Sequence, residues 1–414
     1  TYGGKKTTLT VTVTAKQVTG IAIATPPNKT SYLEGEEIDT TGLTLRVTYN
    51  NGSEEIISGN WTIAGYDSTP GKKNVTVTYG GKNATFTVTV ETTHFAGGYG
   101  TEESPYHIKT WQHLNNIRDY STSWFLLDND LVSDGTLWIP IPKFEGNFDG
   151  QNHSIYNLKI DIHDNKTSTA GLIGWNAGTV IDVSIENTNI VITNALNSPY
   201  AGGLAGTNSG TISGCSYNGE IDSSSNQKMS YAGGITGYNS GKIENCANVG
   251  KINSSFWTGG IAGMNRGTIL TCYNTGAIRS STSLGSIGVS AGGISGENNS
   301  QIKNCFNIGT VSARSSYGES AFAGGIVGTQ IGGATISCYN AGVLTKLYGD
   351  YIGAIAGHYS GGNFENCYYH ENMSSSYGVG AACGQKLKQE QMIKQQSFVG
   401  FDFDTVWTMA GNTD

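Results

Sequence analysis

Aromatic side chains recur at one position in the second half of the chain, two residues before a glycine pair or its equivalent. Aromatic rings that line up on a protein surface can stack against sugar rings or bind peptide. The same rings can instead form a packed stripe inside the molecule or at a corner. On a straight strand Tyr200 faces the same way as Leu204, which favours packing. The candidate ligand-binding residues are Tyr200, Tyr231, Trp257, Phe322 and Tyr351, with Ser290 at the position between Trp257 and Phe322.

Six of the seven cysteines share one repeat position, with spacings of 31, 26, 33, 33 and 29 residues. Val183 holds this position in the first unit, which indicates a small buried hydrophobic side chain rather than a metal ligand. No Cys-x-x-Cys pair supports zinc. Stacked coils bring Cα atoms to about 4.8 Å, which disulfide geometry allows, but side chains in register point in parallel and seven is an odd number. We therefore predict free thiols, no metal and no cofactor; the six are Cys215, Cys246, Cys272, Cys305, Cys338 and Cys367.

Catalytic chemistry has little support in this sequence. β-Helix lyases and hydrolases need carboxylates grouped on neighbouring coils, or a carboxylate-bound cation beside a lysine or arginine base. The acidic residues of the repeats share no position apart from the nearly aligned Glu244 and Glu365. The seven histidines are scattered, without a His-Glu-x-x-His motif. We predict that the chain is not an enzyme and has no catalytic residue.

A glycine repeat organises residues 171 to 370. Its core reads Gly-x-x-Gly-x-Asn in five copies and drifts in two more, and successive second glycines lie 26 to 33 residues apart. Three aliphatic positions recur in the units. The residues around them alternate as in short strands and show no helical period. A short strand cannot bury one face alone, whereas stacked copies bury a continuous core. The first aliphatic ladder is Leu172, Leu204, Ile235, Ile261, Ile294, Ile326 and Ile355.

This repeat predicts a right-handed parallel β-helix of seven units over residues 171–370. We expect the glycines at corners with positive φ, where they carry no steric penalty. The asparagine of each repeat can also tolerate a left-handed corner and can stack its amide along the solenoid axis. That structural ladder is Asn176, Asn208, Asn239, Asn265 and Asn298.

A second repeat lies at the N-terminus, where residues 1–5 and 9–13 are echoed by residues 78–82 and 86–90. Tyr-Gly-Gly-Lys followed by alternation indicates a hairpin turn and a half-buried strand, and a 77-residue period suits one small β-sandwich. Through Val18–Ile21, Tyr32–Glu36 and this hairpin, residues 15–92 resemble the bacterial Ig-like domains of surface proteins, which act there as stalks. Residues 1–14 are then the tail of a truncated module, and a further copy is expected upstream in the parent protein.

Residues 94–414 resemble the GLUG-motif surface proteins, a family named for this glycine pattern. Thr110 predicts the N-cap of a short helix, and residues 387–395 look helical. The resemblance implies that residues 93–170 cap the first coil and residues 371–414 the last. It is carried by the repeats themselves and by Phe95–Thr101, Thr110–Ile117, Phe144–Ile155 and a closing strand at Phe401–Asp404 with Trp407.

Composition limits the partners that this chain can have. The net charge is −8 and only 14% of residues are charged, which argues against binding nucleic acid or an acidic membrane surface. No apolar run approaches the ~18 residues of a transmembrane helix, so we expect no membrane insertion. The expected fold is all-β, an Ig-like β-sandwich followed by the β-helix with short helical caps.

The two resemblances imply an extracellular module on a bacterial cell surface. Its expected function is adhesin-like: the Ig-like stalk presents the β-helix, which binds host or dietary glycan or an extracellular protein. Two alternatives stay open at this point. One is a β-helix enzyme that degrades polysaccharide, and the other is a structural spacer of a larger surface protein.

Overall fold

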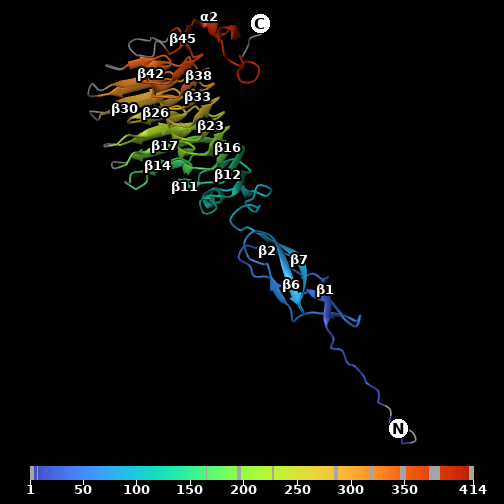
Figure 1. Ribbon diagram of the computed structural model, residues 1–414. Helices are drawn as coiled ribbons and strands as arrows, with labels where there is room; N and C mark the ends of the chain where they lie inside the picture. Colours follow the sequence, from blue (N-terminus) through green and yellow to red (C-terminus); the bar gives the residue numbers. More distant parts are fainter. Residues whose placement is uncertain are drawn as a thin grey trace. The chain divides into compact units, whose positions relative to one another are not determined.

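The computed structural model describes residues 4–6, 8–164, 166–193, 197–225, 228–283, 288–316, 320–345, 351–372 and 383–409. The chain folds into two compact units, Thr1–Tyr99 and Gly100–Asp414. Strands dominate both units (Figure 1). The first unit is an Ig-like sandwich and the second a parallel β-solenoid, which confirms the predicted all-β fold class.

Two sheets form the sandwich of the first unit. One sheet pairs β1 (Val18–Thr25), β3 (Thr44–Tyr49) and β4 (Glu54–Ile57) in antiparallel fashion. The other contains β2 (Ser31–Leu33), β7 (Lys82–Glu91), β6 (Gly71–Tyr79) and β5 (Thr62–Ala64), with β2 parallel to β7. Alternation along the strands buries one face of each, so that Leu45, Val47 and Val77 are fully covered.

Residues 8–17 precede this sandwich and contain no strand. Leu9, Val11 and Val13 are 85%, 71% and 88% exposed. The same alternation occurs in β7, a strand of the second sheet, where Val88 and Val90 are buried on the core side of that sheet. Among the described residues no sheet covers residues 8–17, so the same pattern has nothing against which to bury its apolar face.

The second unit is a solenoid in which every coil adds strands in parallel register to those of the coil before (Figure 1). One sheet has eight strands: β11 (Ile141–Phe144), β15 (Ile173–Asn176), β18 (Ala205–Asn208), β22 (Thr236–Asn239), β27 (Ala262–Asn265), β32 (Ser295–Asn298), β37 (Val327–Gln330) and β42 (Ala356–Tyr359). Another has seven: β14 (Thr169–Ala170), β17 (Tyr200–Gly202), β21 (Tyr231–Gly233), β26 (Trp257–Gly259), β31 (Val289–Gly292), β36 (Ala321–Gly324) and β41 (Tyr351–Gly353).

The remaining strands of the coils form one large sheet that bends around the other side of the core. Its members are β8 (Tyr106–Ile108), β9 (Trp124–Leu127), β10 (Leu131–Val132), β12 (Asn147–Tyr156), β13 (Lys159–Ile162), β16 (Thr179–Thr193), β19 (Thr211–Ser213), β20 (Ser216–Ser224), β23 (Lys242–Glu244), β24 (Ala247–Asn248), β25 (Lys251–Ser254), β28 (Thr268–Leu270), β29 (Tyr273–Asn274), β30 (Ile278–Thr282), β33 (Gln301–Lys303), β34 (Phe306–Asn307), β35 (Val311–Ser315), β38 (Ala334–Ile336), β39 (Tyr339–Asn340), β40 (Leu344–Thr345), β43 (Asn363–Glu365), β44 (Tyr368–His370) and β45 (Gln385–Leu387).

Aliphatic ladders fill the interior of the solenoid. The seven residues of the ladder predicted from the glycine repeat are each at most 1% exposed. A second ladder is also fully buried and consists of Val180, Ile212, Ile243, Ile269 and Ile302. Because each coil covers the apolar side chains of its neighbours, the core is continuous along the axis.

Left-handed corners occur at a different repeat position from the one predicted. The repeat glycines have another role: a Cβ at Gly203 would lie 2.0 Å from the ring of Tyr217, and one at Gly260 would lie 2.1 Å from the carbonyl oxygen of Gly293. Close approach of neighbouring coils, rather than positive φ, therefore requires glycine there. The left-handed residues, with φ between 48° and 64°, directly precede the cysteine position and are Asp182, Gly214, Asn245, Thr271, Asn304, Ser337 and Asn366.

A short helix caps the first coils of the solenoid. α1 (Trp111–Asn116) begins where the sequence predicts, with Thr110 Oγ1 accepting the backbone N–H of His113 at 3.2 Å. It continues into the 3-10 turn η1 (Ile117–Asp119). Leu114 and Ile117 are buried against the first coils, so the apolar stripe fixes the cap in place.

At the other end α2 (Gln389–Met392) and the 3-10 turn η3 (Gln395–Ser397) follow β45. The predicted closing strand at Phe401–Asp404 is wrong, because this segment forms a turn. Asp402 Oδ1 accepts the backbone N–H groups of Asp404 and Thr405 at 2.9 and 3.0 Å, which folds the chain back on itself.

Candidate functional site

The predicted aromatic row lies on the outer surface of the seven-stranded sheet. Tyr200, Tyr231 and Trp257 begin β17, β21 and β26, and the residue after each of them is fully buried. Tyr200 would face inward with Leu204 only on a straight strand, and the chain bends at Gly203 and Leu204. Leu204 enters the core from that corner, whereas Tyr200 stays partly exposed.

The first three rings of this row stack face to face. Ring centroids are 4.9 Å apart for Tyr200 and Tyr231 and 5.1 Å apart for Tyr231 and Trp257, with interplanar angles of 11° and 9°. Burial raises the pKa of Tyr231 to about 12, so its hydroxyl stays protonated at neutral pH. Each ring covers the face of the next, and Tyr231 in the middle of the row is only 9% exposed, so the row offers little ring face on which a sugar could stack.

A cleft opens where this row meets the neighbouring eight-stranded sheet, and we call it the aromatic cleft. Trp175, Thr207 and Tyr238 are register neighbours on β15, β18 and β22, so the small Thr207 lies between two large aromatic residues. The Cα atoms of Trp175 and Tyr238 are two strand spacings apart, about 10 Å. The cleft has a volume of about 430 Å³ and is lined by Trp175, Tyr200, Thr207, Asn208, Ser209, Tyr238 and Ser240.

The walls of the aromatic cleft are held by contacts within the solenoid. Trp175 is 43% exposed, yet its Nε1 donates to Ser209 Oγ at 2.8 Å and Lys143 Nζ lies 4.8 Å from its ring centroid. Tyr238 packs edge to face against Tyr200, with centroids 6.0 Å apart at 76°. Tyr200 is in turn supported by the stack behind it. These contacts fix the rings before any ligand arrives, which lowers the cost of ordering them.

The lining of the aromatic cleft suits an uncharged, hydroxyl-rich ligand. Ser209 Oγ donates to the carbonyl oxygen of Asn176 at 3.3 Å, and Ser240 Oγ donates to that of Asn208 at 3.2 Å. Ser240 Oγ therefore keeps lone pairs with which to accept hydrogen bonds, and Ser209 Oγ, which also accepts the indole N–H of Trp175, keeps one. None of the described residues that line the cleft is charged. Aromatic surface flanked by hydroxyl groups is chemically suited to the apolar face and the hydroxyls of a sugar ring.

The structure brings only one of the five predicted ligand-binding residues, Tyr200, into the aromatic cleft. Tyr231 and Trp257 stand behind it in the stack. Phe322 and Tyr351 lie beyond the break at Ser290, with their ring centroids 5.4 Å apart, and Phe322 also contacts His358. The prediction missed Trp175 and Tyr238, which occupy the variable position before the asparagine of the glycine repeat.

The predicted cysteine row lies inside the solenoid, next to the left-handed corners. All seven cysteines are free and buried, and Val183 is fully buried at the matching position. The backbone N–H of Cys246 contacts Cys272 Sγ at 3.4 Å, and that of Cys272 contacts Cys305 Sγ at the same distance. Burial raises the pKa of Cys272. Within the described ranges no three His, Cys, Asp or Glu side chains are grouped to hold a metal ion.

The predicted asparagine residues form a continuous chain of amide hydrogen bonds. Nδ2 of each residue donates to Oδ1 of the next at 2.8 to 2.9 Å, from Asn176 through Asn208, Asn239 and Asn265 to Asn298. Gln330 accepts the last bond at 3.1 Å. These side chains are almost fully buried and lie outside the left-handed region, so they tie coils together rather than make corners.

Comparison with known proteins gives a family match within the first unit and likenesses to parts of several other proteins. Residues 25–90 match the family model for the bacterial Ig-like domain (group 3). A protein of Evansella cellulosilytica, provisionally named as a Gly-rich membrane protein, is 35% identical over 131 residues, 28% of this chain and 15% of that protein. Pectate lyase L of Thermoclostridium stercorarium is 34% identical over 88 residues, 21% of this chain and 7% of the enzyme. This chain thus spans a small part of these relatives.

The solved structure of a protein from Bacteroides ovatus, provisionally assigned as an immunoglobulin A1 protease, resembles this chain in fold. The TM-score is 0.50 at 20% identity, and the match covers 74% of this chain and 91% of that chain. At this identity the likeness concerns the fold alone. The helices among the described residues are too short and too polar to span a bilayer.

Proposed function

We propose that this chain is an adhesin-like, non-catalytic module of a bacterial surface or extracellular protein and that its solenoid binds glycan through the aromatic cleft. The observation that carries the proposal is the pairing of Trp175 and Tyr238 across Thr207, with serine hydroxyls at the rim. A pyranose ring offers an apolar face to aromatic rings and equatorial hydroxyls to such a rim. An extracellular protein is the other class of partner.

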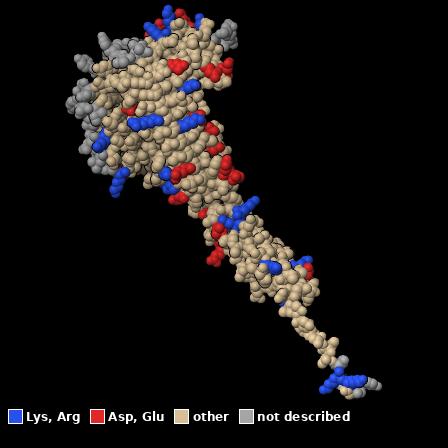
Figure 2. Space-filling model, viewed as in Figure 1, with Lys and Arg blue, Asp and Glu red and all other residues tan. Residues whose placement is uncertain are grey.

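The expected location rests on two findings. Bacterial Ig-like domains match the first unit, and one relative is named as a membrane protein. In this proposal the Ig-like unit is the stalk and the solenoid the ligand-binding part. The low charge density of the solenoid surface agrees with a neutral ligand, since Figure 2 shows charged side chains only as scattered single residues over much of the face that it presents.

Enzymatic cleavage of polysaccharide is the second candidate, because one relative is named as a pectate lyase. Glycoside hydrolysis generally needs two carboxyl groups roughly 5 to 10 Å apart on either side of the scissile bond. A lyase instead needs a base, such as a lysine or arginine side chain, to take a proton from the sugar. The described lining of the aromatic cleft contains no Asp, Glu, Lys or Arg. This favours binding over catalysis at this position.

The test is a glycan array probed with the full chain, followed by calorimetry with the best ligand. Trp175→Ala and Tyr238→Ala should each weaken binding roughly tenfold, since one aromatic contact contributes on the order of 1 kcal/mol. Tyr273→Ala, which removes a 37% exposed tyrosine from the large sheet, is the matched control and should leave affinity unchanged. Shortening of the bound glycan would support the enzyme instead, and the absence of any glycan binding would refute the proposal.

A further inference from the structure

A second aromatic row lies on the outer surface of the large sheet, directly after the cysteine position. Tyr273, Phe306 and Tyr339 are register neighbours whose rings stack with centroids 5.0 and 5.1 Å apart and interplanar angles of 5° and 4°. Tyr368 is the next member, and it is fully buried with its hydroxyl donating to the carbonyl oxygen of Val399 at 2.9 Å. The row therefore starts in solvent and ends beneath the C-terminal segment.

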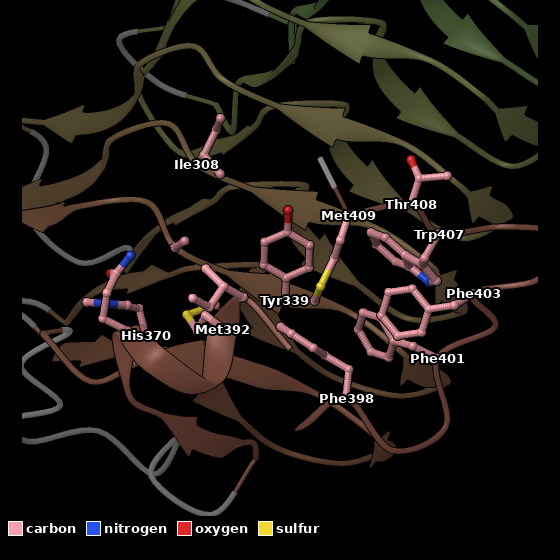
Figure 3. Close-up of a pocket in the computed structure, with 13 residues that line it drawn as sticks. Ile308, Tyr339, His370, Met392, Phe398, Phe401, Phe403, Trp407, Thr408 and Met409 are labelled. Carbon is pink, nitrogen blue, oxygen red and sulfur yellow. The ribbon is translucent and has the colours of Figure 1, made fainter. Parts of the chain in front are cut away.

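The C-terminal segment covers the end of this row with aromatic side chains of its own. Phe401 and Trp407 stack with centroids 4.7 Å apart, and Trp407 lies 5.6 Å from Tyr339 and 6.1 Å from Phe306. The segment does not fill the space above the row. A pocket of about 520 Å³, which we call the cap pocket, lies between them and is the size of a typical small-molecule site. Phe401, Phe403 and Trp407 stand on one side of it, His370 and Met392 on the other, and Tyr339 between (Figure 3).

The ring nitrogens of Trp407 and His370 are not available to a ligand in the cap pocket. Trp407 Nε1 is buried and has no acceptor among the described residues, so a ligand would meet the ring of Trp407 and not its N–H. His370 Nδ1 accepts the backbone N–H of Asn372 at 3.2 Å, so Nε2 carries the proton and donates to Gln389 Oε1 at 2.7 Å. Recognition in this pocket therefore depends on the aromatic walls rather than on these nitrogen atoms.

The charge of the ligand follows from the lining as well. None of the described residues that line the cap pocket is an Asp, Glu, Lys or Arg. A carboxylate or an ammonium group would lose its hydration there without gaining an ion pair. The walls of the pocket favour a ligand with an aromatic ring. The ring of Trp407 lies 4.7 to 6.1 Å, between centroids, from those of Phe401, Tyr339 and Phe306, and another flat ring can pack against such rings.

We propose that the cap pocket binds a small, uncharged aromatic molecule, such as an aromatic ester or amide, whose ring packs against Tyr339 and Trp407. This site is independent of the aromatic cleft, because it is built from the last coils and the C-terminal segment. The proposal goes beyond the glycan-binding function and does not depend on it.

The test is calorimetric or ligand-observed NMR titration of the full chain with methyl cinnamate as the probe. Ile308→Trp should abolish binding, because Ile308 lies at the pocket wall and is 49% exposed, so that the larger side chain fills the pocket without disturbing the core. Ile331→Trp, at a 41% exposed isoleucine outside the pocket, is the matched control and should bind like the parent. Trp407→Ala removes an aromatic wall of the pocket and should weaken binding about three- to tenfold.

Two further probes separate the parts of the proposal. Cinnamate at pH 8 carries a negative charge and should bind at least about tenfold more weakly than methyl cinnamate. Propylbenzene keeps an uncharged aromatic ring and should bind with an affinity similar to that of methyl cinnamate. No binding of methyl cinnamate at millimolar concentration would overturn the proposal and would mean that the chain's own segments fill the pocket. Binding that survives Ile308→Trp would overturn it as well, since the ligand would then lie elsewhere.

Discussion

At the scale of single residues, the corner before each cysteine decides how the coil turns. Seven successive coils adopt φ between 48° and 64° there, and most use Asn, Asp or Gly, which tolerate this region. Thr271 is the exception with a β-branched side chain, at φ 52°. A β-branched residue in the left-handed region is strained, so this corner stores energy that its neighbours do not.

Replacing that threonine should therefore stabilise the solenoid. Thr271→Asn installs the residue that Asn245 and Asn304 supply in the adjacent coils, and Thr271 is exposed, so packing is unaffected. We expect a gain of about 1 kcal/mol in the free energy of unfolding, measured by chemical denaturation. The reverse substitution Asn304→Thr should lose a similar amount. An unchanged midpoint in both variants would show that the left-handed corner carries no strain.

Glu297 is a buried acid on the outer row of the eight-stranded sheet, between Met264 and Thr329 in register, and it is 5% exposed. Burial raises its pKa above the ordinary value of 4.5, against the opposing effect of Arg266. The charged form is thus disfavoured in the folded state. This destabilisation is absent below pH 4.5, where the carboxyl is protonated in both states, and grows as pH rises through the folded-state pKa.

Glu297→Gln keeps the shape of the side chain and removes its charge. The variant should melt at a higher temperature than the parent at pH 8 and at the same temperature at pH 4, as measured by circular dichroism. Glu244→Gln, at a partly exposed glutamate on β23 that pairs with Lys242, is the control and should show no such gain at pH 8. A Glu297→Gln variant that is less stable at pH 8 would mean that the carboxylate has a favourable partner.

At the scale of elements, two buried asparagine ladders join coil to coil. The first follows the glycine repeat. The second lies two residues after the cysteine position, where Asn248, Asn274 and Asn307 each donate Nδ2 to Oδ1 of the next asparagine at 2.7 to 2.9 Å, and the row ends at Asn340. Each amide also donates to a backbone carbonyl two residues later in its own coil, except Asn340, which donates to Ala354 O. Both ladders form because asparagine recurs at the same position of successive coils, which places the side-chain amides one strand spacing apart.

Breaking a ladder in the middle should cost more than removing one hydrogen bond. Asn239→Ala removes one partner of Asn208 Nδ2 and one of Asn265 Oδ1, which keep only longer bonds to backbone groups. We expect a loss of about 1 to 3 kcal/mol in unfolding free energy, since each of the two lost hydrogen bonds contributes about 0.5 to 1.5 kcal/mol. Gln330→Asn, which places the usual ladder residue at the last rung, should change stability much less. Equal effects in the two variants would contradict a cooperative ladder.

At the scale of the whole molecule, the cysteines test the stacking of coils. Each of the seven is buried, so a thiol reagent has little access to the sulfur atoms in the folded chain. Thiol titration should detect almost none in the native chain and about seven after denaturation without reductant. The control is the same titration after reduction, which should give the same total. Fewer than about five thiols in the unreduced, denatured chain would show that disulfides join the coils.

Much of this architecture could be predicted because a repeat in sequence becomes a stack in space. Leu204, Ile235 and Ile261 recur at a fixed place in each unit, and stacking is the arrangement that buries them all. The same logic placed Cys246 next to Cys272, and Asn208 next to Asn239. The helix start at Thr110 was equally local, because a cap depends on residues a few positions apart.

The sequence by itself therefore determined which residues align along the axis, since register follows from the spacing of the repeat. Only the tertiary structure decided what lies side by side around a coil. Whether Trp175 and Tyr238 would meet Tyr200, and whether Phe401 and Trp407 would fold over Tyr339, depends on corner angles and on the path of the last segment. Those are set by backbone close approach and packing between different sheets, which no periodicity in the chain encodes.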